Sequence, residues 1–126
     1  MLANKNLKAF VPTVMQEKAK LFYRDVLGLE LLSEDQYALE FEANGTLLRV
    51  VTVPEFKPHP FTALGWNLDD IAAEIRSLNG KGVFCEHFGF LEQDELGIWT
   101  APGGAMVAWF KDPDGNLLSL TQNPDV

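Results

Sequence analysis

Two histidines, His59 and His87, carry the side chains best suited to acid–base chemistry or to binding a divalent metal. Together with the carboxylates of Glu86, Asp94 and Glu95, they supply ligand types that zinc accepts. Their spacing matches no common metal-binding motif, and His59 lies between two prolines. We therefore expect both histidines at the surface, with an imidazole acting as acid or base as the alternative.

The segment Asp112-Pro113-Asp114-Gly115-Asn116 weakly resembles the start of a calcium-binding loop. It lacks the later ligands and the closing glutamate that such a loop requires. Proline presets φ early in a tight turn, and glycine accepts the positive φ that often follows. The segment is therefore predicted to be a hairpin turn rather than a metal site.

Aromatic residues are numerous enough to line a pocket for a flat or apolar ligand. Most of them are expected in the core, which is their usual place. Trp99 is different because it lies in the acidic segment 90–104, which is suited to a lid or rim beside a pocket. The candidates are Tyr37, Phe41, Trp66, Trp99 and Trp109.

Two hydroxyl residues near the C-terminus, Ser119 and Thr121, alternate with Leu120. Alternate residues of a strand lie on the same face, so both hydroxyls could reach one ligand. A polar edge strand shows the same alternation without any ligand, and the two readings stay open.

The composition describes an acidic globular chain of 126 residues with a net charge of −8. Hydrophobic residues make up 47% and charged residues 22%, which favours one folded domain over disorder. Nucleic acids and anionic membranes both require a basic face, so neither is an expected partner.

The single cysteine, Cys85, excludes an internal disulfide. We expect it to be a small, half-buried hydrophobic residue. No apolar run suits a signal peptide, which predicts a cytoplasmic protein.

The first half of the chain is predicted to form a strand, a helix and three further strands. Thr13 is expected to begin the helix through a capping box with Gln16, and Gly28 to end it in a left-handed conformation. Alternating apolar and polar side chains indicate a strand with one wet face, followed by a hairpin. The predicted strands are 7–13, 29–33, 37–42 and 46–53, the last two joined at Asn44-Gly45.

The second half repeats this order of elements, with negligible sequence identity to the first. Asp69 and Asp70 suit a helix start, because carboxylates cap its first amides and favour its dipole. Apolar residues at helical spacing, Ile71, Ile75 and Leu78, predict its buried face. The extended segments are 61–68, 83–88, 105–110 and 116–122, and the acidic segment 90–104 is surplus to the repeat.

Three stretches of the chain resemble the vicinal oxygen chelate superfamily: LKAFVPT, AKLFYRDVLGLELL and WFKDPDGNLLSL. That superfamily includes glyoxalase I, the bleomycin-resistance proteins and the extradiol dioxygenases. The resemblance implies an α+β fold of paired βαβββ modules that form a curled mixed-sheet cup. It implies a single domain, 1–126, with module one at about 5–58 and module two at about 59–126. It also implies a homodimer, since members commonly complete their cups across a two-fold interface.

The metal enzymes of this superfamily bind a divalent ion through four strand positions, usually His, Gln or Glu. Counting from the shared motifs places these positions at Lys8, Arg49, Ala63 and Ser119. Lysine and arginine are cationic at neutral pH, alanine has no donor atom, and serine alone is a poor ligand. We therefore expect no metal and no other cofactor here.

The same resemblance places Lys8 and Arg49 where side chains point into the cup. Their ammonium and guanidinium groups could together hold a carboxylate or a phosphate. Alternatively, both reach solvent at the rim, or pair with Glu40 or Glu42 on the neighbouring strand.

These observations favour a metal-free protein that binds a small organic molecule, with an organic acid of aromatic body as the specific hypothesis. One alternative is a glyoxalase-like lyase or isomerase using unconventional ligands or no metal, so whether the chain is an enzyme stays open. The other is a non-catalytic module with a filled cup. No catalytic residue is nominated, and the expected partners are the small molecule and a second copy of the chain. The candidate ligand-binding residues are Lys8, Arg49, Ser119, Thr121, Tyr37 and Trp99.

Overall fold

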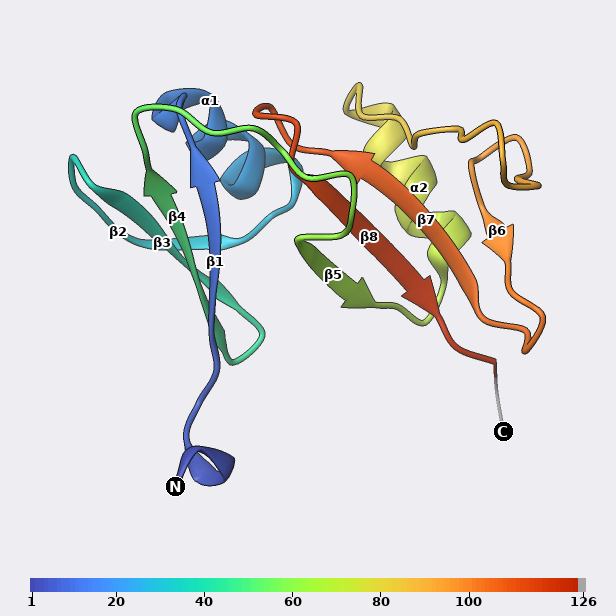
Figure 1. The fold of residues 1–126 in the computed structure, drawn as a ribbon, viewed down its shortest axis with the longest axis horizontal. Coiled ribbons are helices and arrows are strands. Elements are labelled where there is room, and N and C mark those ends of the chain that lie inside the picture. Colours follow the sequence, from blue (N-terminus) through green and yellow to red (C-terminus); the bar gives the residue numbers. More distant parts are fainter. Residues whose placement is uncertain (125–126) are drawn as a thin grey trace. The chain divides into compact units, whose positions relative to one another are not determined.

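The structure is a computed structural model that describes residues 1–124, so the last two residues of the predicted second module lie outside it. It has an α+β fold with two four-stranded mixed sheets, neither of which closes into a barrel (Figure 1). The chain divides into two compact units, Met1–Pro58 and a second that begins at His59. Within the described residues, no helix is both long and apolar enough to cross a membrane.

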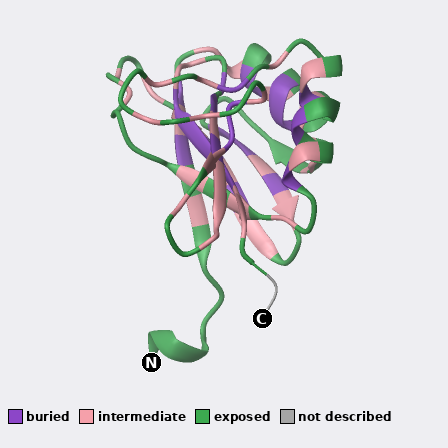
Figure 2. Cartoon of the chain, turned by 90° about the vertical axis from the view of Figure 1, so that its right-hand side faces the viewer, coloured by how far each residue is buried: buried purple, intermediate pink, exposed green. Residues whose placement is uncertain are grey.

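Unit 1 contains one sheet with strand order β1-β4-β3-β2. Strand β1 runs parallel to β4, and the other neighbours are antiparallel. The short helix η1 at the N-terminus is exposed throughout (Figure 2). The elements are η1 (Leu2–Asn4), β1 (Lys8–Thr13), α1 (Gln16–Leu21), η2 (Phe22–Val26), β2 (Glu30–Glu34), β3 (Ala38–Ala43) and β4 (Thr46–Thr52).

One face of this sheet is buried and the other is open to solvent. Helix α1 continues directly into the π-helical turn η2, where the Leu27 amide donates to the Phe22 carbonyl at 3.0 Å. A π turn accommodates an extra residue, and here two consecutive rings, Phe22 and Tyr23, are both buried. Tyr23 packs against Phe41 of β3 with ring centroids 5.9 Å apart. The large apolar strand residues that are buried are Val11, Leu39, Phe41, Leu48 and Val50.

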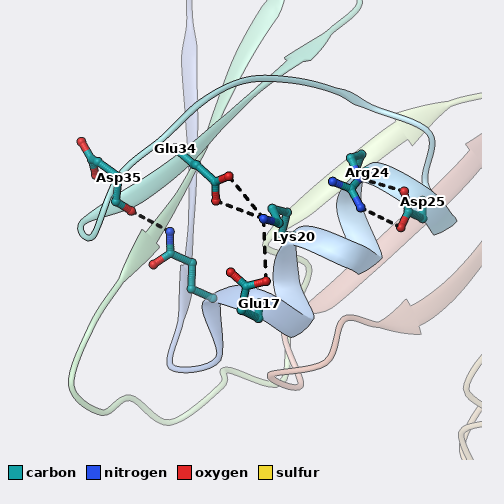
Figure 3. A network of polar contacts seen from close by, with 7 residues as sticks. Glu17, Lys20, Arg24, Asp25, Glu34 and Asp35 are labelled. Atoms are coloured by element: carbon teal, nitrogen blue, oxygen red, sulfur yellow. Dashed lines mark hydrogen bonds and ion pairs between the residues drawn. The ribbon is translucent and has the colours of Figure 1, made fainter.

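The predicted capping box at the start of the first helix is wrong. Met15 is the N-cap residue, and the Thr13 hydroxyl accepts a hydrogen bond from the Met15 amide, two residues along the chain, at 3.0 Å. The Gln16 side chain points to the strands instead: its amide donates to the Asp35 carbonyl at 2.7 Å (Figure 3). Its Oε1 accepts from Thr52 at 3.1 Å. Tertiary hydrogen bonds have thus replaced the local cap.

Two expectations about glycine-containing turns in unit 1 are confirmed. Gly28 ends the helical segment with φ +77°, a conformation that residues with a Cβ rarely adopt. Asn44 and Gly45 both have positive φ, as a two-residue hairpin loop of this type requires. The hairpin fixes the register of β3 against β4, which decides what Arg49 faces.

Unit 2 contains a second sheet, with strand order β5-β8-β7-β6 and β5 parallel to β8. Asp70 caps α2 as predicted, since its carboxylate accepts from the Ala73 amide at 3.1 Å. The predicted stripe Ile71, Ile75 and Leu78 is buried. The elements are β5 (Leu64–Asn67), α2 (Ile71–Gly80), β6 (Trp99–Thr100), β7 (Met106–Lys111) and β8 (Leu117–Gln122).

The prediction for the middle of unit 2 is wrong in one respect. Segment 83–88 is irregular rather than a strand, with the Glu86 amide donating to the Trp109 carbonyl at 2.7 Å. The third element of the repeat is β6, which lies inside the acidic segment 90–104. That segment therefore contributes to the sheet, and its loop positions Trp99 beside β7.

Candidate ligand-binding faces

The open face of unit 1 brings Lys8 and Arg49 to one carboxylate. Arg49 pairs in register with Phe10 on one side and with Glu40 on the other, so the three side chains share a face. The Arg49 guanidinium lies 2.9 Å from Oε2 of Glu40, and the Lys8 ammonium lies 3.3 Å from the same oxygen. Of the two acidic partners considered from the sequence, Glu40 is the one that is used. Glu42 instead accepts from the Gly45 amide.

Glu40 pairs with both cations, and the three groups together carry one net positive charge. Hydrogen bonds from Arg49 and then from Lys8 hold the pKa of the Glu40 carboxyl below its ordinary value. The Arg49 side chain is 30% exposed and that of Lys8 43%, so both remain accessible to a ligand. The geometry therefore supplies a cationic site that already contains one carboxylate.

Phe10 is a residue that the sequence analysis did not nominate. Its side chain is 57% exposed on the open face, and the Lys8 ammonium lies 5.8 Å from its ring centroid. A signal existed, because Phe10 follows Lys8 by two residues on the first predicted strand and must share its face. An exposed ring beside two cations is suited to an aromatic acid.

Unit 2 contains four rings in contact, which we call the aromatic cluster: Phe88, Phe90, Trp99 and Trp109. Trp109 lies at its centre, 6.3 Å from Trp99 and 5.6 Å from Phe88 between ring centroids. Phe88 in turn stacks on Phe90 at 5.6 Å. Phe90 is strongly exposed, and Trp99 and Trp109 are half-buried. Such a surface can stack against a flat ligand.

A pocket of about 390 Å³ adjoins the cluster at Trp99. Its acidic loop is held by Gln93, whose amide donates to the carbonyls of Glu86 and Gly97 and accepts from the Phe88 amide. Oδ1 of Asp94 accepts from two backbone amides of the same loop. The pocket is lined by Glu92, Gln93, Asp94, Ile98, Trp99 and Thr100.

The two hydroxyl residues lie on the same sheet face as Trp109. Ser119 is in register with Trp109 on one side and Gly65 on the other, and it is buried. A Cβ at Gly65 would lie 2.7 Å from the Ser119 hydroxyl, so the glycine makes room for it. Thr121 is half-buried and in register with Val107.

Other predicted aromatic candidates lie apart from this cluster. Tyr37 is exposed and lies just before β3, so the predicted start of that strand at residue 37 is wrong. The Tyr37 amide donates to Asp35, which turns the chain before the strand begins. Phe41 is in the core of unit 1, and Trp66 is paired with Leu120 on the core face of unit 2.

The four positions at which the family resemblance predicts metal ligands do not suit a metal here. Lys8 and Arg49 are ion-paired to Glu40, and Ala63 precedes β5 without a donor side chain. The strand neighbour of Ser119 is Gly65, which also lacks one. Among residues 1–124, no three His, Cys, Asp or Glu side chains gather closely enough to hold an ion.

The other side chains considered for acid–base or nucleophilic chemistry are His59, His87 and Cys85. His59 is exposed and stacks on Phe61 at 4.9 Å, and His87 is exposed too. Burial, followed by the charges of Glu86 and Asp94, raises the pKa of the Cys85 thiol to about 11. The thiol is therefore protonated at neutral pH and is a poor nucleophile.

Both units have the strand–helix–three-strand order, with the first strand parallel to the last. This defines a fold of the glyoxalase and bleomycin-resistance type. The chain belongs to the Glyoxalase/Bleomycin resistance protein/Dioxygenase superfamily, whose family model matches residues 8–120. The resemblance inferred from three sequence stretches is thereby confirmed.

Solved structures of this superfamily cover nearly the whole chain. The antibiotic-binding protein TnmS3 from Streptomyces sp. CB03234 is 28% identical, with a TM-score of 0.73 over 98% of this chain and 99% of that one. A bleomycin resistance determinant encoded on the transposon Tn5 is 22% identical, with a TM-score of 0.75 over 97% and 100%. Lactoylglutathione lyase from Agrobacterium tumefaciens is 18% identical, with a TM-score of 0.72 over 94% and 93%. None of the curated proteins matches the chain.

Proposed function

We propose that this chain is a metal-free binding protein for a small, flat organic molecule. The observation that carries the proposal is the aromatic cluster, of which Trp99 and Trp109 lie on one sheet face, with a pocket beside Trp99. Half-exposed tryptophans offer a large stacking surface at little cost in conformational entropy. The antibiotic-binding relative from Streptomyces supports binding over catalysis, whereas the similarity to the lyase supports the fold alone.

The ligand in this proposal is an organic acid. On the open face of unit 1, Lys8 and Arg49 carry positive charges that can attract an anion, and Phe10 offers an exposed ring beside them. Salt screens a charge that touches the ligand less than it screens the overall charge of the chain. The overall charge acts mainly on the rate at which a ligand meets the protein. For unit 2 taken by itself, Ser119 and Thr121 are proposed to donate hydrogen bonds to a ligand that lies on the aromatic cluster beside Trp109.

The test is a calorimetric titration with three probes that share one aromatic body: 2-naphthoate, 2-naphthalenemethanol and 2-naphthylmethylammonium. We expect the neutral alcohol and the acid to bind, and the acid to bind more tightly than the cation. Prior treatment with EDTA should leave the affinities and the melting temperature unchanged, because the four metal positions have no suitable donors.

Each outcome of this titration has a consequence. If none of the probes binds, the proposed function is wrong. If only the cation binds, the acidic pocket beside Trp99 is the site and the organic acid is excluded. A loss of binding after chelation would show that a metal takes part.

We further propose a homodimer of single-domain chains, each with modules at about 5–58 and 59–126. Large apolar side chains, Leu7 and Leu32 among them, are at least half exposed on unit 1, and a second copy could cover them. Sedimentation equilibrium at micromolar concentration should give twice the chain mass of 14.1 kDa. A single-chain mass under these conditions would contradict the dimer.

A further inference from the structure

We infer that Glu40 determines the charge selectivity of the open face of unit 1, because it occupies the place that the carboxylate of a ligand would take. The inference rests on the proposed function and names the residue that limits which acids bind. Glu40 is then a specificity-determining residue, because it competes with the carboxylate of a ligand for Lys8 and Arg49.

The carboxylate of Glu40 contacts both cations. Oε2 of Glu40 is shared by the Arg49 guanidinium at 2.9 Å and the Lys8 ammonium at 3.3 Å. The other oxygen, Oε1, lies 3.5 Å from the Ser33 hydroxyl. One carboxylate oxygen thus contacts a donor from the neighbouring strand β4 and a second from β1, the strand beyond it. Two cations would hold the carboxylate of a ligand in the same way.

The strand register makes this arrangement a property of the sheet rather than of a loop. Glu40 on β3 is directly opposite Arg49 on β4, and Arg49 is opposite Phe10 on β1. Glu40 is therefore held against the cations by backbone pairing, and its side chain is only 21% exposed. An incoming carboxylate must share Lys8 and Arg49 with it or displace it.

The charge count shows how large the effect should be. With Glu40 ionised, two cations and one carboxylate leave a net charge of +1; without it, the same site carries +2. Other acidic groups nearby act differently: Glu42 bonds to a backbone amide, and Asp35 feels Arg49 but accepts hydrogen bonds from Tyr37 and Ala38. Glu40 alone competes for both cations among the acidic groups described on this face.

The experiment compares Glu40→Gln with wild type in titrations of 2-naphthoate. Glutamine keeps the size and one acceptor oxygen but removes the charge, so affinity for the acid should rise at least tenfold. The gain should shrink with added salt and disappear in the double variant Glu40→Gln, Arg49→Ala. Affinity for 2-naphthalenemethanol should stay within twofold of wild type. Glu40→Ala serves as a second variant should the glutamine misfold.

The matched control is Glu42→Gln, which removes a carboxylate from the same strand and the same face. It should change 2-naphthoate binding by less than twofold. Equal gains in both variants would mean a general charge effect and would overturn the inference, as would no gain in Glu40→Gln and Glu40→Ala. Binding of the neutral alcohol reports on the proposed function separately, so the two failures are distinguishable.

Discussion

Trp109→Ala should weaken the binding of 2-naphthalenemethanol about thirtyfold, equivalent to about 2 kcal/mol. Trp109 is the ring that contacts both Trp99 and Phe88, so its removal separates the aromatic cluster into two parts. The loss combines the stacking surface of Trp109 itself with the positioning of its two neighbours. Calorimetric titration of the variant against wild type measures it.

Trp66→Ala is the matched control for this prediction. Trp66 is the same residue type in the same unit, but its strand pairing with Leu120 places it on the core face. Its loss should lower the melting temperature while leaving the affinity of the folded protein within threefold of wild type. If both variants lose affinity equally, or if Trp109→Ala binds as wild type does, the aromatic cluster is not the ligand-binding surface.

Half of this cluster could be predicted from the sequence. Trp99 and Trp109 were candidates because the type of residue and its surroundings are visible in the chain. Phe88 and Phe90 were missed because they belong to an irregular loop that has no periodic pattern to interpret. Gln93 holds that loop through hydrogen bonds to residues on both sides of it. Contacts of this kind cannot be predicted from the pattern of neighbouring residues.

The fold was more predictable than the site. The turn glycines, the Asp70 cap and the apolar stripe of α2 act locally, so the sequence around them contains the necessary information. The first capping box failed because Gln16 bonds to residues 35 and 52, far along the chain. Short β6 was missed for a similar reason, since its two residues are strand only through pairing with β7.

The ion-pair partner of Lys8 and Arg49 is a further feature that the sequence analysis did not decide. The sequence left solvent, Glu40 and Glu42 as alternatives, because all three are compatible with strand alternation. Only the register set by the Asn44-Gly45 hairpin places Glu40 opposite Arg49 and directs Glu42 toward the hairpin amide. The cations could thus be predicted, and their counter-ion followed from the predicted hairpin, because counting outward from Asn44-Gly45 pairs Glu40 with Arg49.

Asp112→Ala should lower the free energy of unfolding by about 3 kcal/mol, the largest stability effect expected for a single turn residue. The Asp112 side chain is 6% exposed and bonds three times within the hairpin between β7 and β8. Oδ1 accepts from the amides of Asp114 at 3.0 Å and Asn116 at 2.9 Å, and Oδ2 accepts from the Asn116 side chain at 2.8 Å. Alanine leaves these donors buried without that acceptor, which costs more than an exposed hydrogen bond.

Urea denaturation measures this change, and Asp35→Ala provides the control. Asp35 also accepts from two backbone amides, those of Tyr37 and Ala38, but in an exposed turn where water can replace it. Its loss should cost about 1 kcal/mol. If Asp112→Ala is no more destabilising than Asp35→Ala, the hairpin does not depend on the buried carboxylate. A loss of about 3 kcal/mol, with no change on adding calcium, would fit the turn role predicted from the sequence rather than a calcium loop.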